Sequence, residues 1–194
     1  MKTLKIAATV VVVIGLIMVI VITVQPEQVH LERRIVIDAP DSVIFPYLSN
    51  FKKLSIWWPW PKMDAELKQH YEGVDGTVGS KVTWQGEKAG KGSMVIEEID
   101  ENKHVKSLMT IAGQKQTARS EFKLFSDEKG TAVVWTYDGV NDGLVGKAKW
   151  VVMGTLLSSQ YDLGLKNLKE IIEDKNLYKK IIEQVVCFAN QNGG

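Results

Sequence analysis

Residues 118–137 read ARSEFKLFSDEKGTAVVWTY and contain two alternating runs of apolar and polar side chains joined by a turn. Successive side chains of a β-strand point to opposite faces of a sheet, so each run predicts a strand with one apolar face. The stretch therefore predicts a β-hairpin with strands over 118–125 and 131–137. Its apolar face carries Phe122, Leu124, Val133, Trp135 and Tyr137.

The same period of two recurs in the part of the chain that precedes this hairpin. It predicts further strands at Val29–Asp38, Glu66–Tyr71, Lys81–Gln85, Ser93–Ile99 and Val105–Ile111. From residue 65 onward the connections are short and rich in glycine, aspartate and asparagine, which suits antiparallel hairpins and leaves no room for helical crossovers. The sheet is therefore predicted to be an antiparallel meander whose apolar face needs a cover.

A helical stripe near the C-terminus supplies that cover. Apolar residues recur there at steps of four, four, three and four, the spacing of one face of an α-helix, at Leu157, Tyr161, Leu165, Leu168 and Ile172. Residues 142–146 are expected to form the loop before this helix. A weaker amphipathic pattern over Leu177–Ala189 predicts a C-terminal extension, residues 176–194, that is separate from the covering helix.

Short helices are expected between the first strand and the meander. Asp41 or Ser42 can cap a segment that contains Pro46, so a helix there is either short or carries the proline in its first turn. A second short turn is expected at Phe51–Leu54. It leads into an aromatic cluster with three open interpretations: a plug at one end of the interior, a ligand gate, or a belt on lipid headgroups, where tryptophan is enriched. The tryptophans concerned are Trp57, Trp58 and Trp60.

The N-terminal segment Ile6–Val24 reads IAATVVVVIGLIMVIVITV and carries no charge. At about 1.5 Å per residue it spans roughly 28 Å, close to the thickness of the hydrocarbon core of a bilayer. A retained single-pass transmembrane helix is therefore predicted. A cleaved signal peptide is the alternative because Lys2 and Lys5 form a basic flank, although the apolar run is longer than the roughly 7–15 residues usual for such peptides.

Flanking charge predicts the orientation of this segment. Lys2 and Lys5 precede it, and Glu27 is the first charge after it. The positive-inside rule then predicts a cytoplasmic N-terminus and a domain on the extracytoplasmic side of the membrane, although Arg33 and Arg34 weaken the asymmetry.

Several stretches carry a resemblance to a known superfamily. They are RIVIDAP at 34–40, WWPW at 57–60, GKGSMVI at 90–96, GTAVVW at 130–135 and GLKNLK at 164–169. In this order they resemble the START-like or SRPBCC superfamily, which includes polyketide cyclase/dehydrase-like and birch-pollen-allergen-like proteins. The resemblance implies the helix-grip fold, an α+β architecture in which an antiparallel meander wraps around a long C-terminal helix. The predicted organisation is a flank at 1–5, a transmembrane helix at 6–24, the domain at 29–174 and the extension at 176–194.

Members of this superfamily enclose a cavity between sheet and helix that takes an apolar or amphipathic small molecule. The resemblance therefore implies a cavity here, and broad, polarizable aromatic and methionine side chains suit its lining. The expected lining residues are Trp84, Met94, Ile96, Met109, Phe122, Trp135, Tyr137, Leu157, Tyr161 and Leu165. A closed core made of the same residues would have the same sequence pattern, so both interpretations stay open.

The remaining chemistry excludes several classes of protein. His30, His70 and His104 are isolated and lack the spacing of a zinc site, so neither a metal nor another cofactor is expected. The single cysteine, Cys187, excludes an intramolecular disulfide framework. With 24 basic and 23 acidic residues the charges nearly cancel, which argues against a nucleic-acid-binding protein.

Three functions remain compatible with these residues. The first is a membrane-tethered module that binds a lipid-like small molecule. The second is a cyclase/dehydratase- or hydrolase-type enzyme that uses a pocket group such as Glu98 or Tyr137 as acid or base; Glu97 and Glu98 face opposite sides of a regular strand, so one of them could point inward. The third is an envelope scaffold that contacts an unknown protein partner through Leu177–Ala189. No nucleophile is paired with a base, which favours the binding module.

Overall fold

The computed structural model describes residues 2–113 and 116–174. Seven antiparallel strands form one sheet in the order β1-β7-β6-β5-β4-β3-β2, so consecutive strands pair from β2 to β7 and β1 lies beside β7. This confirms the predicted meander. The strands are β1 (Gln28–Ile37), β2 (Lys68–Glu72), β3 (Lys81–Gln85), β4 (Lys91–Asp100), β5 (His104–Ile111), β6 (Ala118–Asp127) and β7 (Gly130–Val140).

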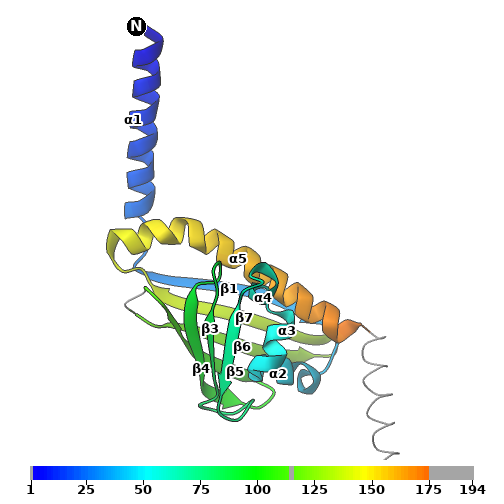
Figure 1. The fold of residues 1–194 in the computed structure, drawn as a ribbon. Helices are drawn as coiled ribbons and strands as arrows, with labels where there is room; N and C mark the ends of the chain where they lie inside the picture. The colour runs from blue at the N-terminus through cyan, green and yellow to red at the C-terminus, as the bar shows by residue number, and fades with distance from the viewer. Residues whose placement is uncertain (1, 114–115, 175–194) are drawn as a thin grey trace, which may run out of the picture.

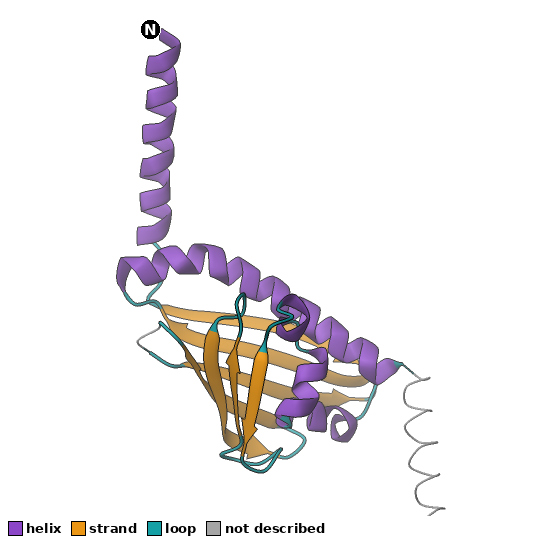
Figure 2. Ribbon diagram, in the orientation of Figure 1, coloured by secondary structure: helices purple, strands orange, loops and turns teal. Residues whose placement is uncertain are grey.

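The long helix α5 (Gly143–Glu173) crosses one face of the curved sheet, as Figures 1 and 2 show. Its core-facing residues Tyr161, Leu165 and Leu168 are buried, as the predicted stripe requires. The predicted loop at 142–146 is wrong, because α5 already begins at Gly143. Gly146 donates its N–H to the carbonyl of Asp142, and a Cβ on it would lie 2.9 Å from the backbone of Asn141. Glycine is therefore needed here for close packing within a helical turn.

Three short helices, α2 (Asp41–Ser49), α3 (Phe51–Trp57) and α4 (Trp60–Met63), lie between β1 and β2. Helix α2 has nine residues, so it is short as expected, but Pro46 lies inside it and beyond the first turn. Asn50 begins α3 by accepting hydrogen bonds from the backbone N–H groups of Lys52 and Lys53 at 2.9 and 3.1 Å. The sequence predicted α3 only as a turn and did not predict α4.

Helix α1 (Lys2–Thr23) projects from the domain and meets α5 only through its last turns, and none of its residues is buried. It is long and apolar enough to cross a membrane, with a mean hydropathy of 3.1 over its most apolar 18 residues, and an N-terminal signal sequence has the same features. Only residues 24–27 separate α1 from β1. The side-chain amide of Asn141 donates to the carbonyl of Pro26 at 2.8 Å, and its backbone N–H donates to that of Glu27 at 2.7 Å. The connection is therefore fastened to the end of β7.

A buried carboxylate joins the short helices to the β3–β4 hairpin. Asp64 follows α4 and accepts backbone N–H groups of Lys88 and Ala89 at 2.8 and 2.9 Å. A side chain at Gly86 would collide with this carboxylate, so the glycine leaves room for it. The hydrogen bond from Ala89, with smaller contributions from the N–H groups of Lys88 and Glu66, holds the pKa of Asp64 below its ordinary value of 3.8.

We expect Asp64→Asn to destabilise the fold in a pH-dependent way. The lowered pKa means that the ionised carboxylate stabilises the folded state above pH 3.8, and this contribution is lost as the pH falls through the folded pKa. Urea denaturation at pH 7 should give a lower midpoint for the variant than for the wild type, and the difference should shrink at pH 3. A constant difference across that range would contradict this role.

Candidate functional site

The structure brings together all thirteen residues that the sequence assigned to the lining and the gate. Each belongs to one hydrophobic cluster or packs against it. The sheet contributes Trp84 from β3, Met94 and Ile96 from β4, Met109 from β5, Phe122 from β6, and Trp135 and Tyr137 from β7; α5 contributes Leu157, Tyr161 and Leu165; and Trp57, Trp58 and Trp60 come from α3, α4 and the link between them. Their proximity is observed, while their role as a ligand lining stays a prediction.

Trp135 lies at the centre of this cluster. The ring of Tyr161 stacks on it with the centroids 3.6 Å apart and the planes 11° from parallel. Phe122 lies 5.0 Å away, and Trp57 meets the same indole edge-on at 5.5 Å. A Cβ on Gly164 would be 3.1 Å from Trp135, so the absence of a side chain there lets α5 approach the sheet closely. This part of the interior is filled by side chains.

A small polar centre lies within these aromatic rings. The indole N–H of Trp135 donates to the hydroxyl of Ser120 at 2.9 Å, and Ser120 is also hydrogen-bonded to the hydroxyl of Tyr161. Ser107, which is also buried, is the direct cross-strand partner of Ser120. Burial raises the pKa of Tyr161 well above its ordinary value, more strongly than the Ser120 hydrogen bond lowers it. Tyr161 is therefore neutral and does not serve as a phenolate base.

A second aromatic group lies at the end of the interior next to α4. Trp58 meets Trp84 edge-on at 5.9 Å and contacts Trp60 at 5.2 Å. The indole of Trp84 covers Gly92, its cross-strand neighbour, where a Cβ would collide with the ring. The Nε1 atom of Trp58 is buried without a hydrogen-bond partner among the described residues. An unpaired buried donor is costly, so an acceptor oxygen brought to this N–H would stabilise the protein.

Trp57, the residue before Trp58, has an indole N–H that is hydrogen-bonded. Trp57 is fully buried, and its indole N–H donates to the carbonyl of Tyr47 at 3.0 Å. The side-chain amide of Asn167 on α5 donates to the carbonyl of Trp57 at 3.0 Å, which ties α3 to the long helix. These contacts match the interpretation of a plug. A belt on lipid headgroups needs exposed indoles, and the burial of Trp57 and Trp58 excludes it for these two residues.

The acid or base expected at Glu97 or Glu98 is not in the interior. A bulge between Ile96 and Glu98 shifts the register of β4 against β5, so both carboxylates are exposed. Glu98 is hydrogen-bonded to His104 at 3.1 Å and forms an ion pair with Lys106 at 3.7 Å. The expectation that one of the two glutamates points inward is therefore wrong. Tyr137 is buried and stacks on Trp150 at 5.8 Å.

Sequence reasoning missed two polar residues of this region. Ser120 alternates with Phe122 along β6 and thus shares its inward face, so a hydroxyl on an apolar face was a usable signal. Asp64 follows the aromatic cluster and carried no local signal, because its partners lie 24 and 25 residues further along the chain. Within residues 2–113 and 116–174, no group of three or more His, Cys, Asp or Glu side chains is placed to hold a metal ion.

The comparisons with known proteins agree with this architecture. The family model described as polyketide cyclase / dehydrase and lipid transport matches residues 28–173, about three quarters of the chain. The chain belongs to this family. Among proteins of curated function, none matches the sequence.

Solved structures share the fold of this family member at low sequence identity. A protein of unknown function from Staphylococcus aureus has a TM-score of 0.61 and 16% identity, covering 79% of this chain and 98% of its own. The Aha1 dimer from Colwellia psychrerythraea has a TM-score of 0.58 and 20% identity, with 75% and 97% covered. A protein from Chromobacterium violaceum has a TM-score of 0.56 and 16% identity, with 78% and 100% covered. These likenesses show the fold alone.

The two adjacent tryptophans should respond differently to the same substitution. Trp57→Phe removes the donor to the Tyr47 carbonyl, whereas Trp58→Phe removes an unpaired donor. Because both changes delete the same atoms, we expect Trp57→Phe to lower the free energy of unfolding by about 1–2 kcal/mol more than Trp58→Phe does. Chemical denaturation of both variants measures this difference, and equal losses would show that the Trp58 N–H is paired in solution.

Proposed function

We propose that this protein is a membrane-anchored module of its family that binds an uncharged, lipid-like small molecule between the sheet and α5. The observation that carries the proposal is the unpaired N–H of Trp58, buried beside Trp84 at one end of an aromatic interior. Such a donor gains a hydrogen bond when a ligand brings a carbonyl, ester or hydroxyl oxygen to it. The inclusion of lipid transport in the family description is in keeping with a ligand of this class.

The polar centre supports an uncharged ligand. The hydroxyls of Ser107, Ser120 and Tyr161 are buried without a charged group among them, Ser120 is hydrogen-bonded to Trp135 and Tyr161, and Tyr161 stays neutral because burial raises its pKa. The cluster that holds them is otherwise built from apolar and aromatic side chains, and a charge placed in such surroundings without a partner is strongly disfavoured. Neutral ligands with an apolar body and one or two oxygen atoms fit this interior best.

Helix α1 supports the anchoring part of the proposal. Its residues from Ile6 to Val21 carry no charge and are exposed, so no protein surface covers them. In a bilayer the same surface would be in contact with lipid chains. The flanking lysines Lys2 and Lys5 then lie on the cytoplasmic side by the positive-inside rule, and the domain lies across the membrane.

Ligand binding is tested on the full-length protein in detergent with an NBD-labelled monoacylglycerol, a neutral probe with an ester carbonyl. We expect saturable binding that Trp58→Phe weakens about fivefold, the factor that corresponds to the loss of one hydrogen bond of about 1 kcal/mol. Trp150→Phe is the control, because this residue stacks on Tyr137, whereas Trp58 contacts Trp60 and Trp84, and the substitution should weaken binding less than Trp58→Phe does. Absence of saturable binding, together with solvent extracts free of lipid by mass spectrometry, would contradict the proposal.

Anchoring is tested by replacing two residues near the middle of α1 with charged ones. Each arginine at such a position costs roughly 2.5–3.5 kcal/mol in membrane insertion, so Ile14→Arg with Ile17→Arg should move the protein from the carbonate-resistant pellet to the supernatant. The paired control Ile14→Leu with Ile17→Leu should stay in the pellet. The intact mass of the wild-type protein shows whether the segment is retained, and a mass lacking the first 24 or so residues would identify a cleaved signal instead.

A further inference from the structure

The side of α5 that faces away from the sheet carries exposed apolar residues over the first two thirds of the helix, with Lys149 and Ser159 as polar neighbours. Val145, Val152, Leu156 and Leu163 follow one another at steps of seven, four and seven, and their exposed fractions are 68%, 69%, 43% and 45%. We call these four residues the outer stripe of α5. A helix side that faces water normally carries polar residues, and a continuous exposed apolar surface marks a contact.

The same side of α5 changes character beyond Leu163. Lys166 and Glu170 continue the outer side, are exposed and form an i,i+4 ion pair at 3.7 Å. This is the pattern of a helix surface in water. The apolar surface is therefore confined to the part of the helix that begins beside α1, and the charged surface is at the far end (Figure 1).

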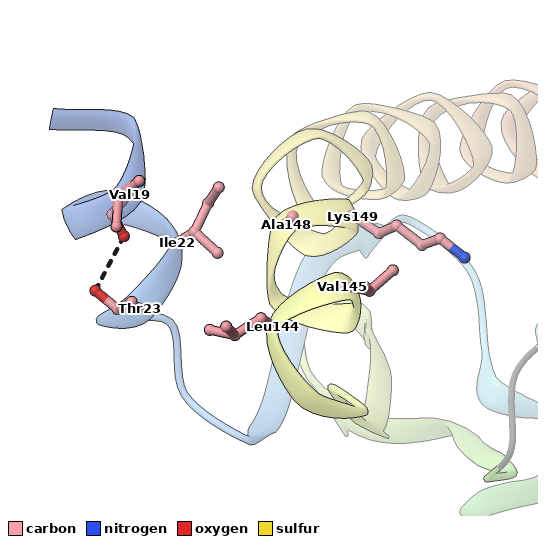
Figure 3. A pocket seen from close by; sticks show the side chains of 7 residues that line it. All are labelled: Val19, Ile22, Thr23, Leu144, Val145, Ala148 and Lys149. Atoms are coloured by element: carbon pink, nitrogen blue, oxygen red, sulfur yellow. Dashed lines mark hydrogen bonds between the residues drawn. The ribbon is translucent and has the colours of Figure 1, made fainter. Parts of the chain in front are cut away.

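The outer stripe begins where α1 ends. Val19, Ile22 and Thr23 of α1 and Leu144, Val145, Ala148 and Lys149 of α5 line one open cleft of about 550 Å³. In Figure 3, Ile22 points toward α5 and Leu144 points toward α1. The ammonium group of Lys147 donates to the carbonyl of Thr23 at 3.4 Å, which joins the last turn of α1 to the first turns of α5.

The short connection holds these parts together. Residues 24–27 span at most roughly 14 Å when extended, at about 3.3–3.6 Å per residue, and Asn141 fastens them through Pro26 and Glu27. With α1 across a bilayer, Thr23 lies near the lipid surface, so the first turns of α5 lie near it as well. Figure 1 shows α5 sloping away from the foot of α1 toward its C-terminal end, and Lys166 and Glu170 belong to that end of the helix.

We propose that the first two thirds of α5 form an interfacial helix whose outer stripe rests on the bilayer that α1 spans. Apolar side chains of such a helix enter the boundary between headgroups and acyl chains, while cationic side chains stay at the level of the phosphates. Lys147 and Lys149, in the first two turns of α5, supply these cations. The cleft between α1 and α5 then forms part of the lipid-facing surface. This inference rests on the anchoring proposed for α1.

The test uses the full-length protein with Cys187→Ser, which removes the single native thiol, in vesicles of phosphatidylcholine and phosphatidylglycerol in equal amounts. Val152→Cys and Glu170→Cys each place an NBD label on the outer side of α5, and Leu156→Cys provides a second probe of the stripe. We expect the labels at 152 and 156 to emit at shorter wavelength than the label at 170, and brominated lipids to quench them at a depth of roughly 5–10 Å. Circular dichroism of each labelled protein confirms that it is folded.

Flotation of the same samples separates the two proposals. Protein that does not float with the vesicles shows that α1 is not an anchor, and both proposals then fail. Protein that floats while the labels at 152 and 156 behave like the label at 170 refutes the interfacial helix and leaves the anchor intact. Labels at 152 and 156 that are shielded but not quenched by brominated lipids show that a second copy or residues 175–194 cover the stripe, which also overturns the proposal.

Discussion

The ring of Tyr161 lies flat on the indole of Trp135, and this contact joins the long helix to the centre of the sheet. The inner face of the sheet carries large apolar side chains from strands β3 to β7, so it is stable in water only when another element covers it. Gly164, one turn after Tyr161, lets α5 come within contact distance of both Trp135 and Trp57. The position of α5, and with it the shape of the interior, therefore follows from this stack.

The two aromatic groups of the interior differ in how their polar atoms are satisfied. The indole N–H of Trp57 donates to the carbonyl of Tyr47, and that of Trp135 donates to the hydroxyl of Ser120. Trp135 belongs to the stack that holds α5, and Trp57 packs against it. Trp58 lies in the other group, and its N–H has no partner among the described residues. An unpaired buried donor lowers the stability of the folded protein, and this is not expected of a residue that only fills the core. This difference between the two groups is the reason why the proposed ligand site is placed at Trp58.

Much of this architecture was predictable because alternation and helical spacing report burial directly. The hairpin at 118–137 was predicted from residues such as Phe122 and Trp135, whose sides of the sheet are set by the period of two. The stripe from Leu157 to Ile172 likewise predicted which side of α5 meets the sheet. Both signals are local, so they can be read without knowledge of the fold.

The features that were not predictable depend on contacts between distant parts of the chain. The bulge after Ile96 turns Glu97 and Glu98 outward, and it arises from the pairing of β4 with β5. Helix α5 begins at Gly143, and its first turn packs Gly146 closely on Asn141. The glycines at 143 and 146 predicted a loop because this contact is not visible in the sequence. Asp64 is paired through backbone groups of the β3–β4 hairpin, so its role emerges only when that hairpin folds back onto α4.

Helix α5 is unusual in having apolar residues on opposite sides over the same turns. Trp150 and Leu157 pack toward the interior, while Val152 and Leu156 lie exposed on the outer side. A helix that covers a core needs only the first set, so packing on the sheet does not explain the second set. If α1 anchors the protein and the outer stripe of α5 rests on the bilayer, α5 alone separates the bilayer surface from the aromatic interior. The distance between that surface and the interior is then the width of one helix, about 10–12 Å.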